Sequence, residues 1–403
     1  MSSLFIPESS AISHKEPTCI IDPTMSRMFF ENLRSSLLDA PSGFSIFYAV
    51  KCNPDREIMH SLSSTSCSFE VASVTEFEEV LKLDNVKPSL IPVTNPILSV
   101  DDLAYILNLQ GRIFVVDSLG QLSRLASACQ ITNTPFNDIK IILRLAVPND
   151  NAAWDLSDKF GLPLEEILHI SQLLISYGFS FLGFSFHVGS QALSADAYIN
   201  ALHITEKAIL LVKENNLVTK IIDIGGGFPL DYHASSITGA ALPTKKILES
   251  VVSFVNKSPV LTSSAIWLEP GRFLAAPAGH IITKVVGRAN RNNRPWVYAL
   301  TGSYNGVTEA KDLKDSFNFP VSYNYSKFKN SPVSNCVVTG PTCDSSDIYS
   351  YSSPLPDLLD SSDIIQYPFA GAYSLNLWSS FNGFPPPAIE YKHGVLTNLY
   401  LNK

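Results

Sequence analysis

The sequence has few charged residues for its length and no run of one charge. Asp, Glu, Lys and Arg make up 16% of the 403 residues, hydrophobic residues make up 45%, and the formal net charge is −8. A chain of this length and composition can bury a large core, which excludes an intrinsically disordered protein. No cluster of Lys and Arg marks a surface for nucleic acid or for anionic membranes, so we expect neither as a partner.

Cysteines are also few, and they are scattered. None forms a CxxC pair, so the sequence predicts neither a disulfide framework nor a metal site. We therefore expect free thiols in a reducing, cytoplasmic environment. The first residues lack a basic start followed by an apolar run, and no apolar stretch reaches membrane-spanning length, so neither a secretory signal nor a membrane span is predicted.

Short apolar runs alternate with amphipathic stretches between residues 40 and 275. Near-continuous apolar runs are typical of strands in a buried parallel sheet. Eight βα repeats predict an α/β fold, a TIM (β/α)8 barrel, with a doubly wound open sheet as the alternative. The predicted strands cover residues 44–50, 66–71, 88–93, 112–117, 139–147, 181–188, 220–225 and 265–270, and the predicted helices cover residues 73–83, 99–109, 119–129, 163–178 and 195–216. Ser73 and Ser99 are predicted N-caps, and Ser73 with Glu76 fits a capping box.

After residue 276 helical periodicity nearly disappears, while Pro, Ser, Asn and Tyr crowd the connections. This texture predicts a C-terminal all-β domain over residues 276–403, joined by a strand-like N-terminal segment, residues 1–23. The barrel is then expected over residues 24–275. The predicted strands of the β-domain are 281–289, 296–302, 334–340 and 388–401.

Reactive side chains stand at or near the C-terminal ends of the predicted barrel strands, where TIM barrels build their active sites. Lys51, His187 and Glu269 end three strands, and Glu70 and Arg144 lie late in two others. Because Lys51 follows the uncharged run SIFYAV, we expect an apolar wall around it, which disfavours the ammonium and makes the amine nucleophilic enough to form an imine. A lysine that reaches solvent and a purely structural histidine are the alternatives for Lys51 and His187.

Two further segments suit an anion. DIGGGFP (223–229) places three glycines after a strand, where backbone N–H groups can approach a phosphate closely, although a tight turn is the alternative. LEPGR (268–272) supplies a carboxylate and, three residues later, a guanidinium suited to phosphate, with a surface Glu–Arg pair as the alternative.

In the β-domain, GPTCDSSD (340–347) places a thiol beside a carboxylate in a loop that also suits an Asx turn.

These motifs, in this order, resemble the fold-type III pyridoxal-phosphate (PLP) decarboxylases, most closely the eukaryotic-type ornithine decarboxylase group. The resemblance spans nearly the whole chain, and GPTCD and FNGF favour the ornithine branch. It implies a PLP-dependent homodimer that decarboxylates a basic, ornithine- or lysine-like amino acid. The matching segments are FYAVKCN (47–53), FEVAS (69–73), FHVGS (186–190), DIGGGFP (223–229), EPGR (269–272), GPTCD (340–344) and GAYSLNLWSSFNGF (371–384).

The resemblance also implies roles for residues that bind the cofactor. Lys51 would form the internal aldimine, His187 would stack on the pyridine ring, and Glu269 would hold the ring nitrogen protonated. Arg144 and Lys159 match positions around the site or its neighbouring loop. The phosphate would be bound by Ser190, Gly225, Gly226, Gly227, Arg272 and Tyr373, and Gly271 and Glu70 complete the predicted cofactor site. Glu70 stands where the family usually has Asp.

On the substrate side, the resemblance implies that Cys343 reprotonates the α-carbon and that Asp344 holds the distal ammonium. Both would reach into the partner subunit's site, and Phe381 would line the same pocket.

One position departs from the family. Ala310 stands where the family has a second acidic residue, with Glu309 adjacent and Asp312 near. Truncating a hydrogen-bonded charge pair costs about 2–5 kcal/mol. Either Glu309 therefore replaces the missing contact, or the substrate has changed.

Three alternatives to a decarboxylase stay open. A catalytically inactive regulatory homologue usually lacks the lysine, the cysteine or the phosphate ligands, all of which this chain keeps. An amino-acid racemase of the same fold would need a tyrosine where GPTCD supplies a thiol. A PLP-free class I aldolase would not need Glu269.

Overall fold

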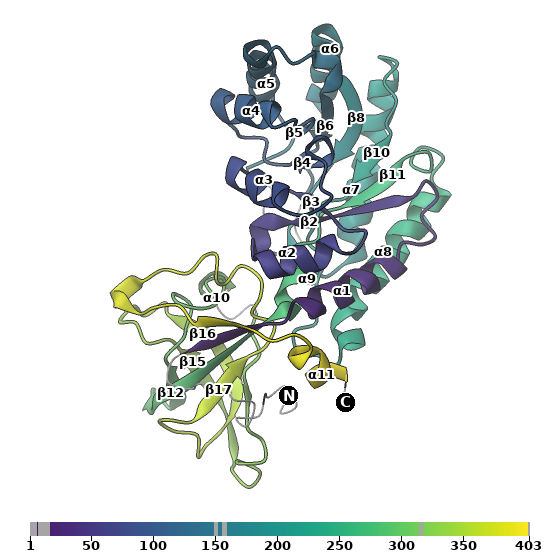
Figure 1. Ribbon diagram of the computed structural model, residues 1–403. Helices are drawn as coiled ribbons and strands as arrows, with labels where there is room; N and C mark the ends of the chain where they lie inside the picture. The colour runs from purple at the N-terminus through teal and green to yellow at the C-terminus, as the bar shows by residue number, and fades with distance from the viewer. Residues whose placement is uncertain (1–5, 7–16, 149–151, 155–158, 314–316, 402–403) are drawn as a thin grey trace. The chain divides into compact units, whose positions relative to one another are not determined.

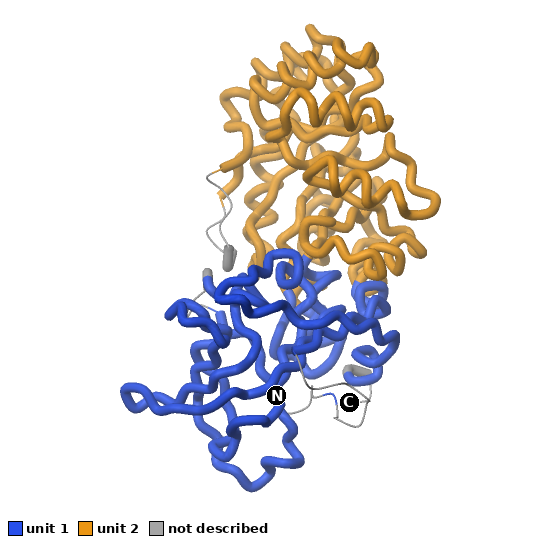
Figure 2. Tube along the Cα trace, turned by 60° about the vertical axis from the view of Figure 1, so that its left-hand side comes forward, with its two compact units in different colours: residues 1–29, 230–242, 272–403 blue, residues 30–229, 243–271 orange. Residues whose placement is uncertain are grey.

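The computed structural model describes residues 6, 17–148, 152–154, 159–313 and 317–401. By contacts, the chain separates into two compact units, which Figure 2 colours separately. The first unit draws on residues 1–29, 230–242 and 272–403, and the second on residues 30–229 and 243–271. The domain boundaries predicted from the sequence remain a prediction.

Eight parallel strands form a closed barrel in the second unit (Figure 1). Their order is β3-β2-β11-β10-β8-β6-β5-β4, and a parallel bridge between Val71 and Val93 joins the two ends. Closure excludes the doubly wound open sheet and confirms the predicted TIM barrel. The strands are β2 (Phe44–Ala49), β3 (Ser68–Glu70), β4 (Pro92–Val93), β5 (Ile113–Val116), β6 (Lys140–Arg144), β8 (Ser180–Ser185), β10 (Ile221–Asp223) and β11 (Ala265–Leu268).

Branched apolar residues from several barrel strands pack together in this unit. Ile113 and Val115 of β5 share one face of their strand, since alternate residues point the same way. They pack with Ile142 and Ile221, and Trp267 covers the cluster. The predicted strand 88–93 is reduced to the two residues of β4, because Pro88 begins a 3-10 turn, Pro88–Leu90.

Helices follow the strands along the chain and lie outside them (Figure 1). Ser73 and Ser99 are N-caps, as predicted. The capping box predicted at Ser73 is wrong, because the Glu76 carboxylate accepts the N–H of Ala72 (2.7 Å); Ser99 and Asp102 form one instead. The helices are α1 (Pro23–Ser35), α2 (Arg56–Ser63), α3 (Val74–Leu81), α4 (Val100–Asn108), α5 (Leu119–Thr132), α6 (Ile167–Tyr177), α7 (Ala195–Lys213) and α8 (Ile237–Lys257). Within the described residues, no helix is both long and apolar enough to cross a membrane.

The first unit is built on a second sheet of eight strands. Six follow the order β14-β17-β12-β13-β15-β16, while β1 pairs with β12 and β18. This sheet confirms the predicted C-terminal all-β fold. The strands are β1 (Thr18–Ile21), β12 (Gly279–Arg291), β13 (Arg294–Ala299), β14 (Ser322–Tyr323), β15 (Val333–Thr339), β16 (Ile348–Pro356), β17 (Ile364–Tyr367) and β18 (Ala388–Tyr391), and the short helices are α9 (Arg272–Ala275) and α10 (Ala310–Leu313).

The strand predicted over residues 388–401 is wrong in its second half. The strand β18 ends at Tyr391, Gly394 adopts a positive φ of 79°, and α11 (Val395–Leu401) follows. The carboxylate of buried Asp22 accepts the N–H groups of Gly394 (3.1 Å) and Leu396 (2.9 Å) and so caps this helix. Two short strands, β7 (Ala152–Trp154) and β9 (Ser190–Ala192), form a separate antiparallel pair in the second unit.

Candidate active site

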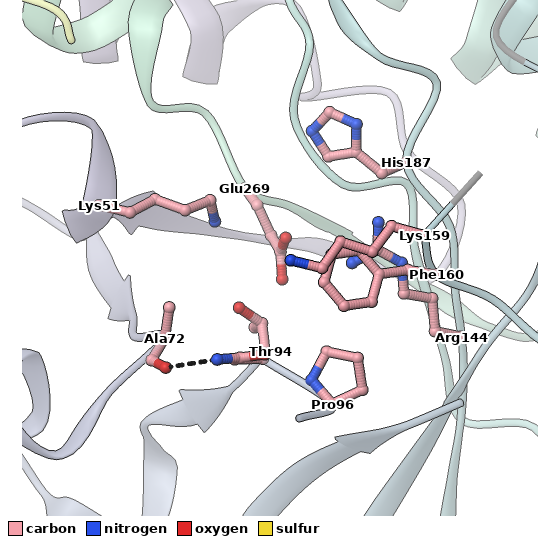
Figure 3. Close-up of a pocket in the computed structure, with 10 residues that line it drawn as sticks. Lys51, Ala72, Thr94, Pro96, Arg144, Lys159, Phe160, His187 and Glu269 are labelled. Atoms are coloured by element: carbon pink, nitrogen blue, oxygen red, sulfur yellow. Dashed lines mark hydrogen bonds between the residues drawn. The ribbon is translucent and has the colours of Figure 1, made fainter. Parts of the chain in front are cut away.

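A cavity of about 490 Å³ lies at the C-terminal ends of the barrel strands in the second unit. Pockets of this size accommodate small ligands. The structure brings five of the residues singled out from the sequence together around it. It is lined by Lys51, Ala72, Thr94, Asn95, Pro96, Arg144, Lys159, Phe160, His187 and Glu269. Figure 3 shows the amine of Lys51 and the carboxylate of Glu269 pointing into the same space.

Lys51 lies in the 3-10 turn Val50–Cys52, directly after β2. Its Nζ forms an ion pair with Oε1 of Glu70, and the hydroxyl of Thr94 donates to the other oxygen, Oε2. The Glu70 side chain is 0% exposed, and that of Lys51 is 39% exposed. The expected apolar wall is therefore wrong for the immediate surroundings of the amine, because a buried carboxylate is its partner and stabilises the ammonium form.

The turn that carries Glu269 packs closely against the turn that carries Lys51. The N–H of Ala49 donates to the carbonyl oxygen of Pro270 (3.2 Å). A Cβ on Gly271 would lie 2.8 Å from the Cβ of Cys52, so a larger residue there would push the two turns apart. Gly271 thus lets the turns that carry the lysine and the carboxylate lie close together after two neighbouring strands.

Glu269 lies beside a second carboxyl group, that of Asp223 at the end of β10. Burial, and then repulsion from Asp223 and Glu70, raise the pKa of Glu269 well above its ordinary value. Burial raises the pKa of Asp223 to about 6, although the N–H of Gly225 donates to its Oδ1 (2.9 Å). Two buried carboxyl groups at this proximity favour sharing one proton. The sequence interpretation did not single out Asp223, although it begins the DIGGGFP motif and ends a strand.

His187 presents a neutral imidazole to the cavity. The N–H of Gly189 donates to its Nδ1 (3.0 Å), so the neutral ring carries its proton on Nε2. Burial, and then the positive charges of Arg144 and Lys51, lower the pKa of His187 to about 3. The guanidinium of Arg144 lies 5.0 Å from the ring centre of Phe160. Its Nε is buried and has no hydrogen-bond partner within the described part of the chain.

Gly225, Gly226 and Gly227 form the turn after β10. Gly225 and Gly227 adopt positive φ angles of 66° and 87°, and a Cβ on Gly226 would lie 2.6 Å from the carbonyl oxygen of Glu269. The turn therefore requires glycine, as the tight-turn interpretation expects. It also leaves the N–H groups of Gly226 and Gly227 without a hydrogen bond to any described residue, which suits an anion. Ser190, half-buried at the start of β9, completes the predicted phosphate ligands of this unit.

In the first unit, Arg272 forms a bidentate ion pair with Glu309. Its two terminal nitrogens lie 2.6 and 2.5 Å from the two carboxylate oxygens, and it donates to the hydroxyl of Tyr232 (3.2 Å). The side chains of Arg272 and Glu309 are 4% and 11% exposed. Burial opposes the charge of Arg272, but Glu309 and Tyr232 raise the pKa of the guanidinium above its ordinary value. The ring centre of Tyr373, another predicted phosphate ligand, lies 5.1 Å from the guanidinium.

The ion pair bears on the substrate contact predicted for Glu309. Both of its carboxylate oxygens already bind Arg272, so a substrate ammonium at Glu309 would compete with a buried guanidinium. Ala310 is 3% exposed at the start of α10, and the side chain of Asp312 lies outside the described residues.

Cys343 and Asp344 lie in a hydrogen-bonded loop of the first unit. The Cys343 thiol is exposed, and its backbone N–H donates to Oδ1 of Asn382 (3.0 Å). The Asp344 carboxylate accepts the hydroxyl of Tyr304 (2.5 Å) and the N–H of Ser346 (2.7 Å), so the Asx turn considered as an alternative is present. These hydrogen bonds, that of Tyr304 first, lower the pKa of Asp344 to about 2.

An aromatic pair lies beside Asp344. The Tyr304 ring stacks on Phe381 with 4.8 Å between centroids, and Phe381 is 41% exposed. The amine of Lys311 lies 3.6 Å from the centre of the Tyr304 ring. The sequence interpretation singled out neither Tyr304 nor Lys311, since an aromatic ring and a lysine before an Asp carry no pattern of their own.

Comparisons with known proteins agree with this arrangement. The family model "Pyridoxal-dependent decarboxylase, pyridoxal binding domain" matches residues 30–276. The chain is 29% identical to the lysine/ornithine decarboxylase of Selenomonas ruminantium over 342 residues, which is 84% of this chain and 81% of the relative. It is 24% identical to antizyme inhibitor 2 of Xenopus laevis, over 86% of this chain and 75% of the relative.

A solved structure shares the fold. The lysine/ornithine decarboxylase of Vibrio vulnificus, complexed with putrescine, superposes with a TM-score of 0.80 at 26% identity over 96% of each chain. The family match covers more than half of the chain. Residues of the second unit suit its cofactor, because they offer a lysine amine, a carboxyl pair and two backbone N–H groups that no described residue accepts. The chain belongs to the pyridoxal-dependent decarboxylases, and its cofactor is pyridoxal 5'-phosphate.

Proposed function

We propose that this protein decarboxylates a basic amino acid, ornithine- or lysine-like, to the corresponding amine. One observation carries the proposal: the Lys51 amine, the Glu269 carboxyl group and the neutral His187 ring border one cavity. The names of the relatives, lysine/ornithine decarboxylases, support a basic substrate. When bound, PLP supplies the electron sink for the pair of electrons left on the α-carbon as CO2 departs.

Lys51 is the residue that binds the cofactor's aldehyde carbon. Its Nζ must lose a proton to do so, and Oε1 of Glu70 lies where that proton can be held. Glu269 and Asp223 hold a proton between them, and Glu269 would hold the ring nitrogen of the cofactor. His187 would hold the ring of the cofactor, and it takes no proton near neutral pH.

The backbone N–H groups of Gly226 and Gly227, with Ser190, would bind the phosphate. Arg272 and Tyr373 are proposed as further phosphate ligands. If Arg272 binds a phosphate, it does so while paired with Glu309, which offsets its charge. Arg144 contributes positive charge to the wall of the cavity.

The substrate's other contacts are proposed in the first unit. Sγ of Cys343 delivers a proton to the α-carbon, and Asp344 binds the distal ammonium. The low pKa of Asp344, about 2, supports the second role, because the carboxylate stays charged at neutral pH. Phe381 lines the same pocket. We further propose that the protein works in the cytoplasm as a homodimer in which Cys343 and Asp344 serve the partner subunit.

An inactive regulatory homologue is the second candidate, favoured by the similarity to antizyme inhibitor 2. The retained lysine and the exposed thiol favour an enzyme. The two candidates differ in whether CO2 is released.

The test is CO2 release by the PLP-loaded protein from ornithine, lysine, arginine and diaminopimelate, measured side by side. We expect turnover of ornithine or lysine that is lost in Lys51→Ala. No release from any of the four by a protein with bound PLP would refute the substrate class. Equal release by Lys51→Ala would refute the role of the lysine.

A further inference from the structure

We infer that Thr94 is a positioning residue that controls the protonation and orientation of Lys51 through Glu70. The three side chains form one line: the Thr94 hydroxyl donates to Oε2 of Glu70, and Oε1 of Glu70 pairs with Nζ of Lys51. The inference deepens the proposed function, since it matters for catalysis only if Lys51 carries the cofactor.

The barrel fixes the Thr94 hydroxyl in place. Thr94 directly follows β4, and its N–H donates to the carbonyl oxygen of Val71 (2.9 Å) at the seam that closes the barrel. The residue is 7% exposed, and Glu70, one strand away, is 0% exposed. Because the backbone on both sides is hydrogen-bonded, the Cα of Thr94 keeps its place beside Glu70, and only rotation about χ1 of Thr94 can move the hydroxyl away from the carboxylate.

A glutamate at position 70 needs such an anchor. A glutamate has one more rotatable bond than an aspartate, so its carboxylate can turn in more ways. A hydroxyl can donate one proton, and an ionised carboxylate only accepts. Donation to Oε2 therefore holds that oxygen at Thr94 and leaves Oε1 directed at the amine.

The contact with Glu70 should lower the reactivity of the Lys51 amine. A fixed negative charge beside the amine stabilises the ammonium form, which does not react with an aldehyde. Weakening the anchor should make the amine of Lys51 more reactive at a given pH but less well aimed into the cavity. Thr94 and Lys51 both line that cavity (Figure 3).

The test compares Thr94→Val with Thr94→Ser in the full-length chain. Valine keeps the shape and the backbone hydrogen bond and removes the donor, while serine keeps the donor. Without PLP, the rate at which acetic anhydride labels Lys51 is measured by mass spectrometry from pH 6 to pH 10. We expect Thr94→Val to raise the labelling rate at pH 7 about tenfold and to move its pH midpoint down, since a hydrogen bond to a charged group is worth roughly this ratio. Thr94→Ser should behave as the unchanged protein does.

A merely structural role gives a different result. Thr94→Val would then lower the melting temperature and leave the labelling midpoint where it is, which would overturn the inference. A change of equal size in Thr94→Ser would overturn it as well, because the donor is retained there.

A double substitution guards against misfolding of the valine variant. If Thr94 acts through Glu70, then Glu70→Gln should raise the labelling rate by itself, and Thr94→Val should add nothing to it. Additive effects would contradict the inference.

The proposed function can fail separately. If PLP does not attach to Lys51 in the unchanged protein while the labelling shift is observed, the proposed function fails and the coupling stands. If PLP attaches and the shift is absent, the coupling fails.

Discussion

Replacing Glu309 by Gln tests whether this residue belongs to the fold rather than to the substrate. The carboxylate makes two hydrogen bonds to the buried guanidinium of Arg272, with side-chain exposures of 11% and 4%. Glutamine is nearly isosteric, but it removes the charge and one acceptor, which leaves a buried cation without a counterion. Breaking a buried pair in this way costs about 3–5 kcal/mol. We expect urea unfolding of Glu309→Gln to show a loss of this size in the free energy of unfolding.

A matched control lies in the same unit. Glu390 pairs with Lys392 at 3.6 Å, and the two side chains are 32% and 37% exposed. Glu390→Gln should cost no more than about 1 kcal/mol, because solvent screens the pair. If the two variants lose the same stability, and Glu309→Gln instead raises KM for a diamino substrate, then Glu309 is a substrate contact and the argument from the ion pair is refuted.

Three further predictions concern the cofactor and the chemistry. Folding lowers the pKa of His187 from 6.5 to about 3, so between these values the unfolded chain binds a proton there that the folded chain does not. The free energy of unfolding should therefore fall by about 2 kcal/mol between neutral pH and pH 5. His187→Asn should remove this pH-dependent loss in urea unfolding, and an unchanged pH dependence would contradict the shift. Gly226→Ala should weaken PLP binding at least about tenfold in a fluorescence titration, since its Cβ would lie 2.6 Å from the Glu269 carbonyl oxygen. Gly287→Ala, whose Cβ would have nothing within 4 Å, should leave the affinity unchanged. Equal affinities of the two variants would refute the role of the glycine turn in binding the phosphate. Cys343→Ala should release less amine than CO2 as protonation is misdirected, and a constant one-to-one ratio with unchanged turnover would remove the role of the thiol.

The barrel could be predicted from the sequence because its signals are local. Apolar runs such as FSIFYAV and amphipathic helices with Ser N-caps specify strand and helix without reference to distant residues. The motifs at the strand ends then converge, because parallel strands that close into a barrel direct their C-terminal ends to one face. Lys51, Arg144, His187 and Glu269 therefore meet around one cavity.

What the sequence did not predict depends on contacts between distant segments. Residues 395–401 look like a strand, but Asp22, more than 370 positions earlier, caps them as a helix. The run before Lys51 is apolar, yet the amine meets Glu70 on the next strand. Nothing local marks Arg272 as the partner of Glu309, or Asp223 as the neighbour of Glu269. Pairings of this kind are set by how the fold brings distant segments together and not by periodicity.

The central claim is that the amine of Lys51 binds the aldehyde of PLP. Borohydride reduction of the PLP-loaded protein, followed by peptide mass spectrometry, converts that bond into a stable mass increase on one lysine. We predict the pyridoxyl group on Lys51 alone, and none after Lys51→Ala. Its appearance on Lys159 or another lysine, or on no lysine while PLP stays bound, would contradict the account.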